Sequence, residues 1–82
     1  MYSVYVLKSQ KDDNLYIGCT SDLKYRLLSH NQGRVRSTKG RRPLQLIYQE
    51  NFDNQYEAFR KERFYKTAKG KRELKIKIWG VV

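Results

Sequence analysis

The sequence predicts an α+β domain, a small and mainly antiparallel sheet of three strands in the order ββαβα, flanked by helices. Three observations lead to this prediction. Short runs rich in valine, isoleucine and tyrosine alternate with polar turns, as strands do. Two segments with helical spacing of apolar residues each begin at a capping residue. The 82 residues, 39 % hydrophobic and 32 % charged, suit one globular domain over 1–82 with a modest core.

The first two strands are expected to pair as a hairpin. Residues 2–8 (YSVYVLK) and 15–19 (LYIGC) are rich in the residue types that strands favour. The polar segment between them, SQKDDN, has the composition of a turn.

A helix should follow directly after this hairpin. Gly18 leads into the polar cluster Thr20-Ser21-Asp22, whose side-chain oxygens can accept from the free N–H groups of a first helical turn. The helix is expected from 22 to about 31, and the sequence NQG is a suitable stop.

The second half predicts a loop and a third strand. Residues 34–42 (RVRSTKGRR) contain Val35 as their only apolar residue and are expected to be a loop. Residues 43–50 (PLQLIYQE) alternate enough for a strand, with Pro43 at its start, where a missing N–H does little harm.

The last part predicts a helix followed by a shorter element. Asn54 with Glu57 three residues later resembles a capping box for a helix from about 55 to 68. Gly70 is expected to end that helix, and residues 71–79 (KRELKIKIW) fit either a short helix or a strand.

The charge predicts a polyanionic partner. Eighteen lysines and arginines against eight acids give a net charge of +10. Residues 34–42 contain five cations and no acid, and residues 60–77 contain nine cations against two acids. Such a field attracts nucleic acid. Anionic lipid is a rival partner, and solvated surface lysines are the alternative without a partner.

The composition also indicates a location. Cys19 is the single cysteine, so no internal disulfide is expected, and the first residues lack the basic start of a signal peptide. No stretch approaches the ~20 apolar residues of a membrane span. The expected location is the cytoplasm, without a membrane partner.

Three residues are candidates for chemistry at this point. Arg26 and the only histidine, His30, lie four residues apart and therefore on one side of the predicted helix. On the later helix Ala58, Glu62 and Tyr65 form a stripe that faces the core, with a carboxylate in its middle. A desolvated carboxylate requires a partner. That partner is either a cation of the chain, such as Arg26 or a lysine, or a metal ion such as Mg²⁺.

The ordered set of motifs resembles the GIY-YIG nuclease domain. The matching segments, in chain order, are SVYVL at 3–7, LYIG at 15–18, SDLKYRLLSHN at 21–31 and EAFRKERFYK at 57–66. The resemblance extends to about Leu74 and is strongest to small stand-alone bacterial members, which are similar to the N-terminal domain of an excision-repair endonuclease subunit.

The resemblance assigns roles to residues of the first two strands. Tyr5 and Tyr16 match the tyrosines of the two half-motifs, and Gly18 matches the closing glycine, interpreted as a turn residue that needs no Cβ. Ser3 and Val4 stand where glycine and isoleucine give the family its name.

The resemblance also assigns roles to residues of the helices. Arg26 matches the arginine that holds the scissile phosphate, and His30 matches a histidine found in many members. Glu62 matches the carboxylate that binds the divalent metal, Mg²⁺ or Mn²⁺. Many larger members have an asparagine after the glutamate helix, and no asparagine follows Asn54 here.

The implied activity is metal-dependent cleavage of DNA. Arg26 would contact the nonbridging oxygens through its planar fork of donors. Nearby positive charges would favour the phenolate of a tyrosine base, or His30 would take the proton. Five cations of the loop are expected to bind the DNA backbone, namely Arg34, Arg36, Lys39, Arg41 and Arg42. The alternatives are a nucleic-acid-binding module with little activity of its own and a nuclease directed at RNA.

Overall fold

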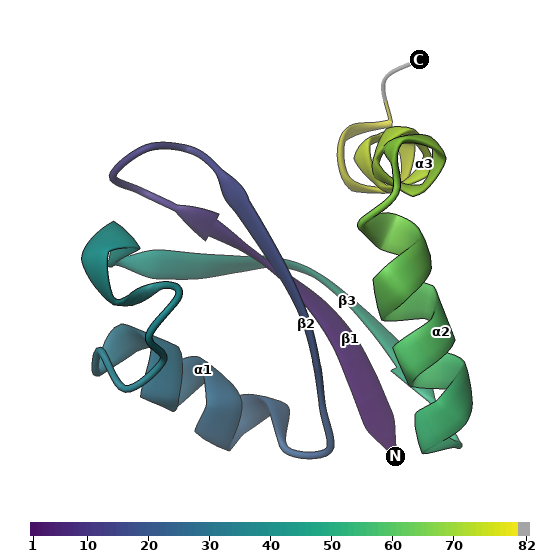
Figure 1. Ribbon diagram of the computed structural model, residues 1–82, viewed down its shortest axis with the longest axis horizontal. Coiled ribbons are helices and arrows are strands. Elements are labelled where there is room, and N and C mark those ends of the chain that lie inside the picture. The colour runs from purple at the N-terminus through teal and green to yellow at the C-terminus, as the bar shows by residue number, and fades with distance from the viewer. Residues whose placement is uncertain (81–82) are drawn as a thin grey trace.

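The three strands form one antiparallel sheet, as expected. The computed structural model describes residues 1–80 of the chain. Strand β1 (Tyr2–Ser9) lies in the centre, between β2 (Leu15–Thr20) and β3 (Leu44–Phe52). Both neighbours run antiparallel to β1 (Figure 1). Both outer strands are therefore sheet edges.

Helices cover the two faces of this sheet. Helix α1 (Leu23–Asn31) lies on one side, and α2 (Gln55–Tyr65) and α3 (Ala68–Trp79) lie on the other (Figure 1). A single 3-10 turn, η1 (Lys39–Arg41), interrupts the segment that was expected to be a loop throughout. The α+β prediction is confirmed, and the observed order is ββαβαα.

The predicted ends of the last two helices were wrong. Helix α2 ends at Tyr65, and Thr67 caps α3 by accepting a hydrogen bond from the Gly70 N–H at 3.0 Å. Gly70 therefore lies inside α3 and does not break a helix. A Cβ at this position would overlap the Phe64 carbonyl oxygen. The glycine is needed because α3 begins in close contact with the end of α2.

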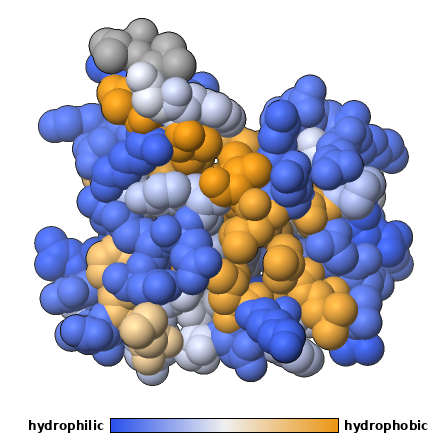
Figure 2. Space-filling view, turned by 180° about the vertical axis from the view of Figure 1, so that it is seen from behind, coloured by the Kyte–Doolittle hydropathy of each residue, from blue (hydrophilic) through white to orange (hydrophobic). Residues whose placement is uncertain are grey.

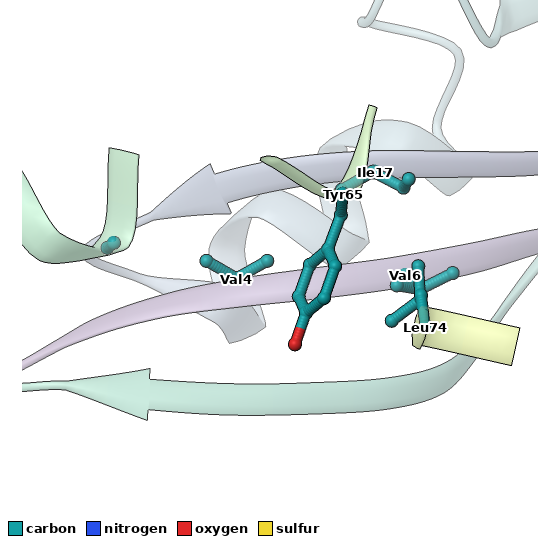
Figure 3. Packing of buried hydrophobic residues seen from close by; sticks show 6 residues of the cluster. Val4, Val6, Ile17, Tyr65 and Leu74 are labelled. Carbon is teal, nitrogen blue, oxygen red and sulfur yellow. The ribbon is translucent and has the colours of Figure 1, made fainter. Parts of the chain in front are cut away.

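Side chains alternate along β1 to form a core on each face of the sheet. Val4 and Val6 pack with Ile17, Tyr65 and Leu74 beneath α2 and α3 (Figure 3). On the opposite face the smaller cluster is made by Tyr5, Leu7 and Leu44 under α1. The Tyr5 side chain thus lies between the sheet and α1.

Tyr65 anchors the helices to β3 through its hydroxyl group. Its ring is fully buried, and the hydroxyl points toward β3 (Figure 3). The hydroxyl donates to Glu50 Oε1 at 2.8 Å and accepts from Lys77 Nζ at 3.0 Å. This contact joins β3, α2 and α3.

Replacing Glu50 with alanine is expected to destabilise the protein by about 1–3 kcal/mol, because the buried Tyr65 hydroxyl loses its acceptor. Gln45→Ala, at an exposed position on the same strand, is the control and should change stability by less than about 0.5 kcal/mol. Urea unfolding of both variants measures the difference. Equal midpoints would show that water replaces the carboxylate without cost.

The surface is mostly charged, with one apolar band. From behind, apolar side chains gather across the middle of the molecule, between charged regions on either side (Figure 2). Within residues 1–80, no helix has the length and apolar character that a membrane span requires.

Candidate active site

A buried chain of polar side chains starts at Tyr5. The Tyr5 hydroxyl lies 3.0 Å from His30 Nε2, and His30 Nδ1 lies 2.8 Å from Thr38 Oγ1. All three side chains are buried, and they come from β1, α1 and the segment before η1. Thr38 was not among the predicted site residues, since a threonine in a polar loop has no distinguishing pattern in sequence.

The contacts indicate one direction of hydrogen bonding through this chain. The Arg26 guanidinium lies within hydrogen-bonding reach of the Tyr5 hydroxyl and can only donate. These contacts are compatible with Tyr5 donating to His30 Nε2 and with Nδ1–H donating to Thr38. The Thr38 hydroxyl in turn donates to the Val35 carbonyl at 3.4 Å. In that arrangement the lone pair of His30 Nε2 faces Tyr5.

Burial keeps both members of the Tyr5–His30 pair neutral. Burial raises the pKa of Tyr5 to about 12, although the Arg26 hydrogen bond acts in the opposite direction. Arg26 thus favours the phenolate, as expected, but burial of Tyr5 outweighs this effect. Burial, and then the charge of Arg26, lower the pKa of His30. A neutral imidazole at neutral pH can accept a proton.

Tyr16 and Arg26 form the more exposed part of the site. Tyr16 is half-buried and packs its ring edge-on against His30, with centroids 4.9 Å apart. Its ring centroid lies 6.3 Å from that of Tyr5. Arg26 is half-buried and interacts with the hydroxyls of both tyrosines, which raise its pKa. The structure thus brings together the four residues predicted to be catalytic.

Gly18 has a different role from the predicted one. It lies within β2, directly opposite Tyr5 in the strand pairing, and not in a turn. A Cβ here would overlap the hydroxyl and ring of Tyr5. The glycine lets the Tyr5 ring lie across β2, which allows the hydroxyl to reach His30.

Glu62 approaches this group from α2. Its side chain is 14 % exposed and pairs with Lys66, whose Nζ lies 2.6 Å from Oε2. A lysine was one of the two kinds of cation expected to pair with Glu62. Arg26, the other, forms no ion pair with Glu62 within residues 1–80. The Glu62 charge contributes to the raised pKa of Tyr5 and of Cys19, after burial in each case. The carboxylate therefore acts on Tyr5 through its charge, and its one ion pair within residues 1–80 is with Lys66.

A comparison with protein families shows which family this chain belongs to. A family model described as the GIY-YIG catalytic domain matches residues 1–76. The chain belongs to the GIY-YIG family. GIY-YIG proteins are nucleases that generally depend on a divalent metal.

Relatives and a solved structure agree with this family. UPF0213 proteins of Staphylococcus saprophyticus and Staphylococcus haemolyticus are each 42 % identical to the chain over 74 residues. The matched residues cover 89 % of this chain and 89 % of each relative. The solution NMR structure of a UPF0213 protein from Bacillus halodurans has a TM-score of 0.58 and 31 % identity. It matches 98 % of this chain and 87 % of its own. The similarity therefore extends over nearly the full chain.

The donor set around Glu62 fits the hard cation of a GIY-YIG nuclease. In residues 1–80 there is no group of three or more histidine, cysteine, aspartate or glutamate side chains that could hold a metal. A zinc site needs three or four such ligands. Mg²⁺ keeps several waters and needs only one or two carboxylates besides the substrate phosphate. Glu62 alone is thus compatible with Mg²⁺ or Mn²⁺.

The basic segment of this GIY-YIG domain is only partly free for a ligand. Arg34, Arg36, Lys39 and Arg42 are exposed. Arg41 is half-buried, and its Nε lies 3.5 Å from Asp12 Oδ2 in the β1–β2 hairpin.

This pairing corrects one of the sequence-based arguments. The five cations have no acid nearby in sequence, which argued against a purely internal role, but folding brings the hairpin against η1, with Lys11 Nζ donating to the Gly40 carbonyl at 3.2 Å. Arg41 therefore has a structural partner, and Arg42 donates from Nε to the Lys39 carbonyl at 2.8 Å.

Proposed function

We propose that this GIY-YIG protein is an Mg²⁺- or Mn²⁺-dependent endonuclease that hydrolyses DNA phosphodiester bonds. The observation that supports it most is that Tyr5, Tyr16, Arg26 and His30 come together from β1, β2 and α1. We further propose that it selects DNA by structure more than by sequence, because phosphate contacts position a protein without reading bases. Repair or recombination is the context that such selectivity suits.

The proposed chemistry uses the directed hydrogen bonds of the site. A bound divalent cation at Glu62 would polarise the phosphoryl group and stabilise the leaving oxygen. Arg26 presents its guanidinium to the nonbridging oxygens. Tyr5 accepts a proton from the attacking water while it passes its own proton to His30 Nε2. This relay avoids a free phenolate, which the raised pKa of Tyr5 disfavours.

His30 can hold the transferred proton because of Thr38. Protonated His30 still donates from Nδ1 to the Thr38 hydroxyl, so the imidazolium keeps a hydrogen-bond partner on both nitrogens. Tyr16, which is half-buried and interacts with Arg26, would contact the phosphate beside it.

The experiment that tests this proposal is incubation with single-stranded, duplex, flapped and branched DNA, with Mg²⁺ and with a chelator. Cleavage that requires the metal supports the endonuclease. Binding without cleavage of any substrate would contradict it and support a nucleic-acid-binding module of the same fold. Matched RNA substrates separate the third possibility, cleavage directed at RNA.

The exposed cations of the basic segment should bind the DNA backbone. The triple variant Arg34→Ala, Arg36→Ala, Lys39→Ala is expected to weaken binding of all sequences alike. It should reduce the slope of log K against log salt by about 2–3, near one unit for each lost phosphate contact. Salt titrations of DNA binding measure the slope. Ser37→Ala, exposed in the same segment, is the control, and an unchanged slope in the triple variant would place the DNA elsewhere.

Lys66 should compete with the metal for Glu62. Lys66→Met removes an ammonium group that lies 2.6 Å from the carboxylate, so Mn²⁺ should bind more tightly. Since exposed ion pairs are worth about 0.2–1 kcal/mol, the expected gain is at most about fivefold. Calorimetric titration with Mn²⁺, without DNA, measures it. Lys69→Met, which has no carboxylate partner among the described residues, is the control, and equal affinities of both variants would refute the competition.

A further inference from the structure

A groove separates the β1–β2 hairpin from α3. Ile17 of β2 and Leu74 of α3 contribute apolar side chains to it, and Lys71, Lys75 and Trp79 line it from the helix. Both walls lie at the same end of the molecule (Figure 1), and a notch is visible in the upper outline of the space-filling view (Figure 2). The groove is separate from the Tyr5–His30 pair, which lies on the α1 side of the sheet.

The helix wall combines an aromatic ring with two cations on one face. Lys71, Lys75 and Trp79 follow each other at spacings of four residues, so their side chains lie in a row. Trp79 is 49 % exposed, although α3 has a buried face that could take an apolar residue. Neither lysine forms an ion pair within residues 1–80. An exposed indole in line with two unpaired ammonium groups is suited to a ligand with a flat ring and negative charge.

The opposite wall does not cancel this positive charge. It contains two carboxylates, and each has a cation of its own. Asp12 lies 3.5 Å from Arg41, and Asp13 lies 3.7 Å from Lys8. The groove therefore favours an anion on the α3 side.

The groove and the candidate active site lie on opposite faces of the same edge strand, β2. Its residues Leu15 and Ile17 flank Tyr16 in the strand, and successive side chains of a strand point to opposite faces. Because β2 is an edge strand, a polymer that passes Tyr16 along this edge meets the groove within a few residues. An extended ligand can occupy both places.

We propose that the α3 groove binds a single-stranded stretch of the DNA substrate, with a base stacked on Trp79 and phosphates on Lys71 and Lys75. Stacking on aromatic rings combined with backbone cations is the usual way to hold unpaired nucleotides. In a duplex the bases are stacked on each other and do not offer their faces. The proposal rests on the proposed function and specifies its substrate, DNA with unpaired nucleotides next to the cut.

Trp79 is the only tryptophan of the chain, so its fluorescence reports on this contact alone. The Glu62→Gln protein is titrated with oligo(dT) and with a duplex of equal length, and binding is followed in parallel by anisotropy of labelled DNA. Oligo(dT) should quench Trp79, and duplex should quench it much less at equal occupancy. Absence of quenching when the labelled oligo(dT) is bound, or equal quenching by duplex, overturns the proposal.

Variants test the residues of the row. Trp79→Ala should weaken binding of oligo(dT) by about fivefold or more, and Lys71→Ala with Lys75→Ala should weaken it and abolish quenching at the same DNA concentration. The matched control is Lys69→Ala with Arg72→Ala, which removes the same charge from α3 outside the groove. A control variant that loses as much affinity as the Lys71–Lys75 variant overturns the proposal, since net charge alone would then explain the binding.

These measurements are independent of cleavage. Cleavage without quenching would support the endonuclease proposal and refute the proposal that the groove binds DNA. Quenching without cleavage of any substrate would support DNA binding in the groove and refute the endonuclease proposal.

Discussion

Replacing Glu62 with glutamine should reduce DNA cleavage by orders of magnitude while the fold stays intact. Glutamine keeps the shape of the side chain but loses the charge that a divalent cation needs. Within residues 1–80 the one ion pair lost is the contact with Lys66, whose side chain is exposed, so the loss is worth about 1 kcal/mol. The measurements are the cleavage rate in Mg²⁺ and thermal unfolding of both proteins.

A second measurement separates the metal from the ion pair. Calorimetric titration with Mn²⁺ should lose its signal in Glu62→Gln and keep it in Glu57→Gln, an exposed glutamate on the same helix. If Glu62→Gln cleaves DNA as fast as the parent, the carboxylate has only a structural role with Lys66. The metal would then need a different ligand.

Arg26→Lys should lower kcat by about a hundredfold to a thousandfold, although the positive charge is kept. Lysine loses the planar fork that can contact two phosphoryl oxygens at once. The loss of one transition-state donor in a comparable role costs about 3–4 kcal/mol. Arg26 also contacts the hydroxyls of Tyr5 and Tyr16, so its replacement loosens both tyrosines.

The control for Arg26 is Arg34→Lys in the exposed basic segment, where charge alone should be sufficient. Single-turnover cleavage at saturating DNA isolates the chemical step from binding. Turnover of Arg26→Lys equal to the parent would show that the site needs a local charge and no particular donor geometry.

The structural roles of two glycines, Gly18 and Gly70, could not be predicted from the sequence. A turn and a close approach both require a residue without Cβ, so the pattern alone does not distinguish them. Gly18 was interpreted as a turn residue, and it lies in a strand because the Tyr5 ring crosses it. Gly70 was interpreted as a helix end, and it lies in α3 because Phe64 is in contact with it.

Contacts between distant segments account for the other differences. Arg41 and Asp12 are 29 positions apart, and only the docking of η1 on the hairpin pairs them. Thr38 became a site residue because its segment folds back over His30. The burial that raises the pKa of Tyr5 also depends on α1 and on this segment together.

The sequence by itself determined the sheet, the starts of α1 and α2, and the family. Alternation of apolar residues, the capping side chains Asp22 and Asn54, and the spacing of the motif residues are local properties, which neighbouring residues define. Tertiary structure alone decided that Tyr5, His30 and Thr38 meet, and that Arg41 of the basic segment pairs with Asp12. Both depend on burial and on partners contributed by other elements, and free energies of that kind arise only when the chain has folded.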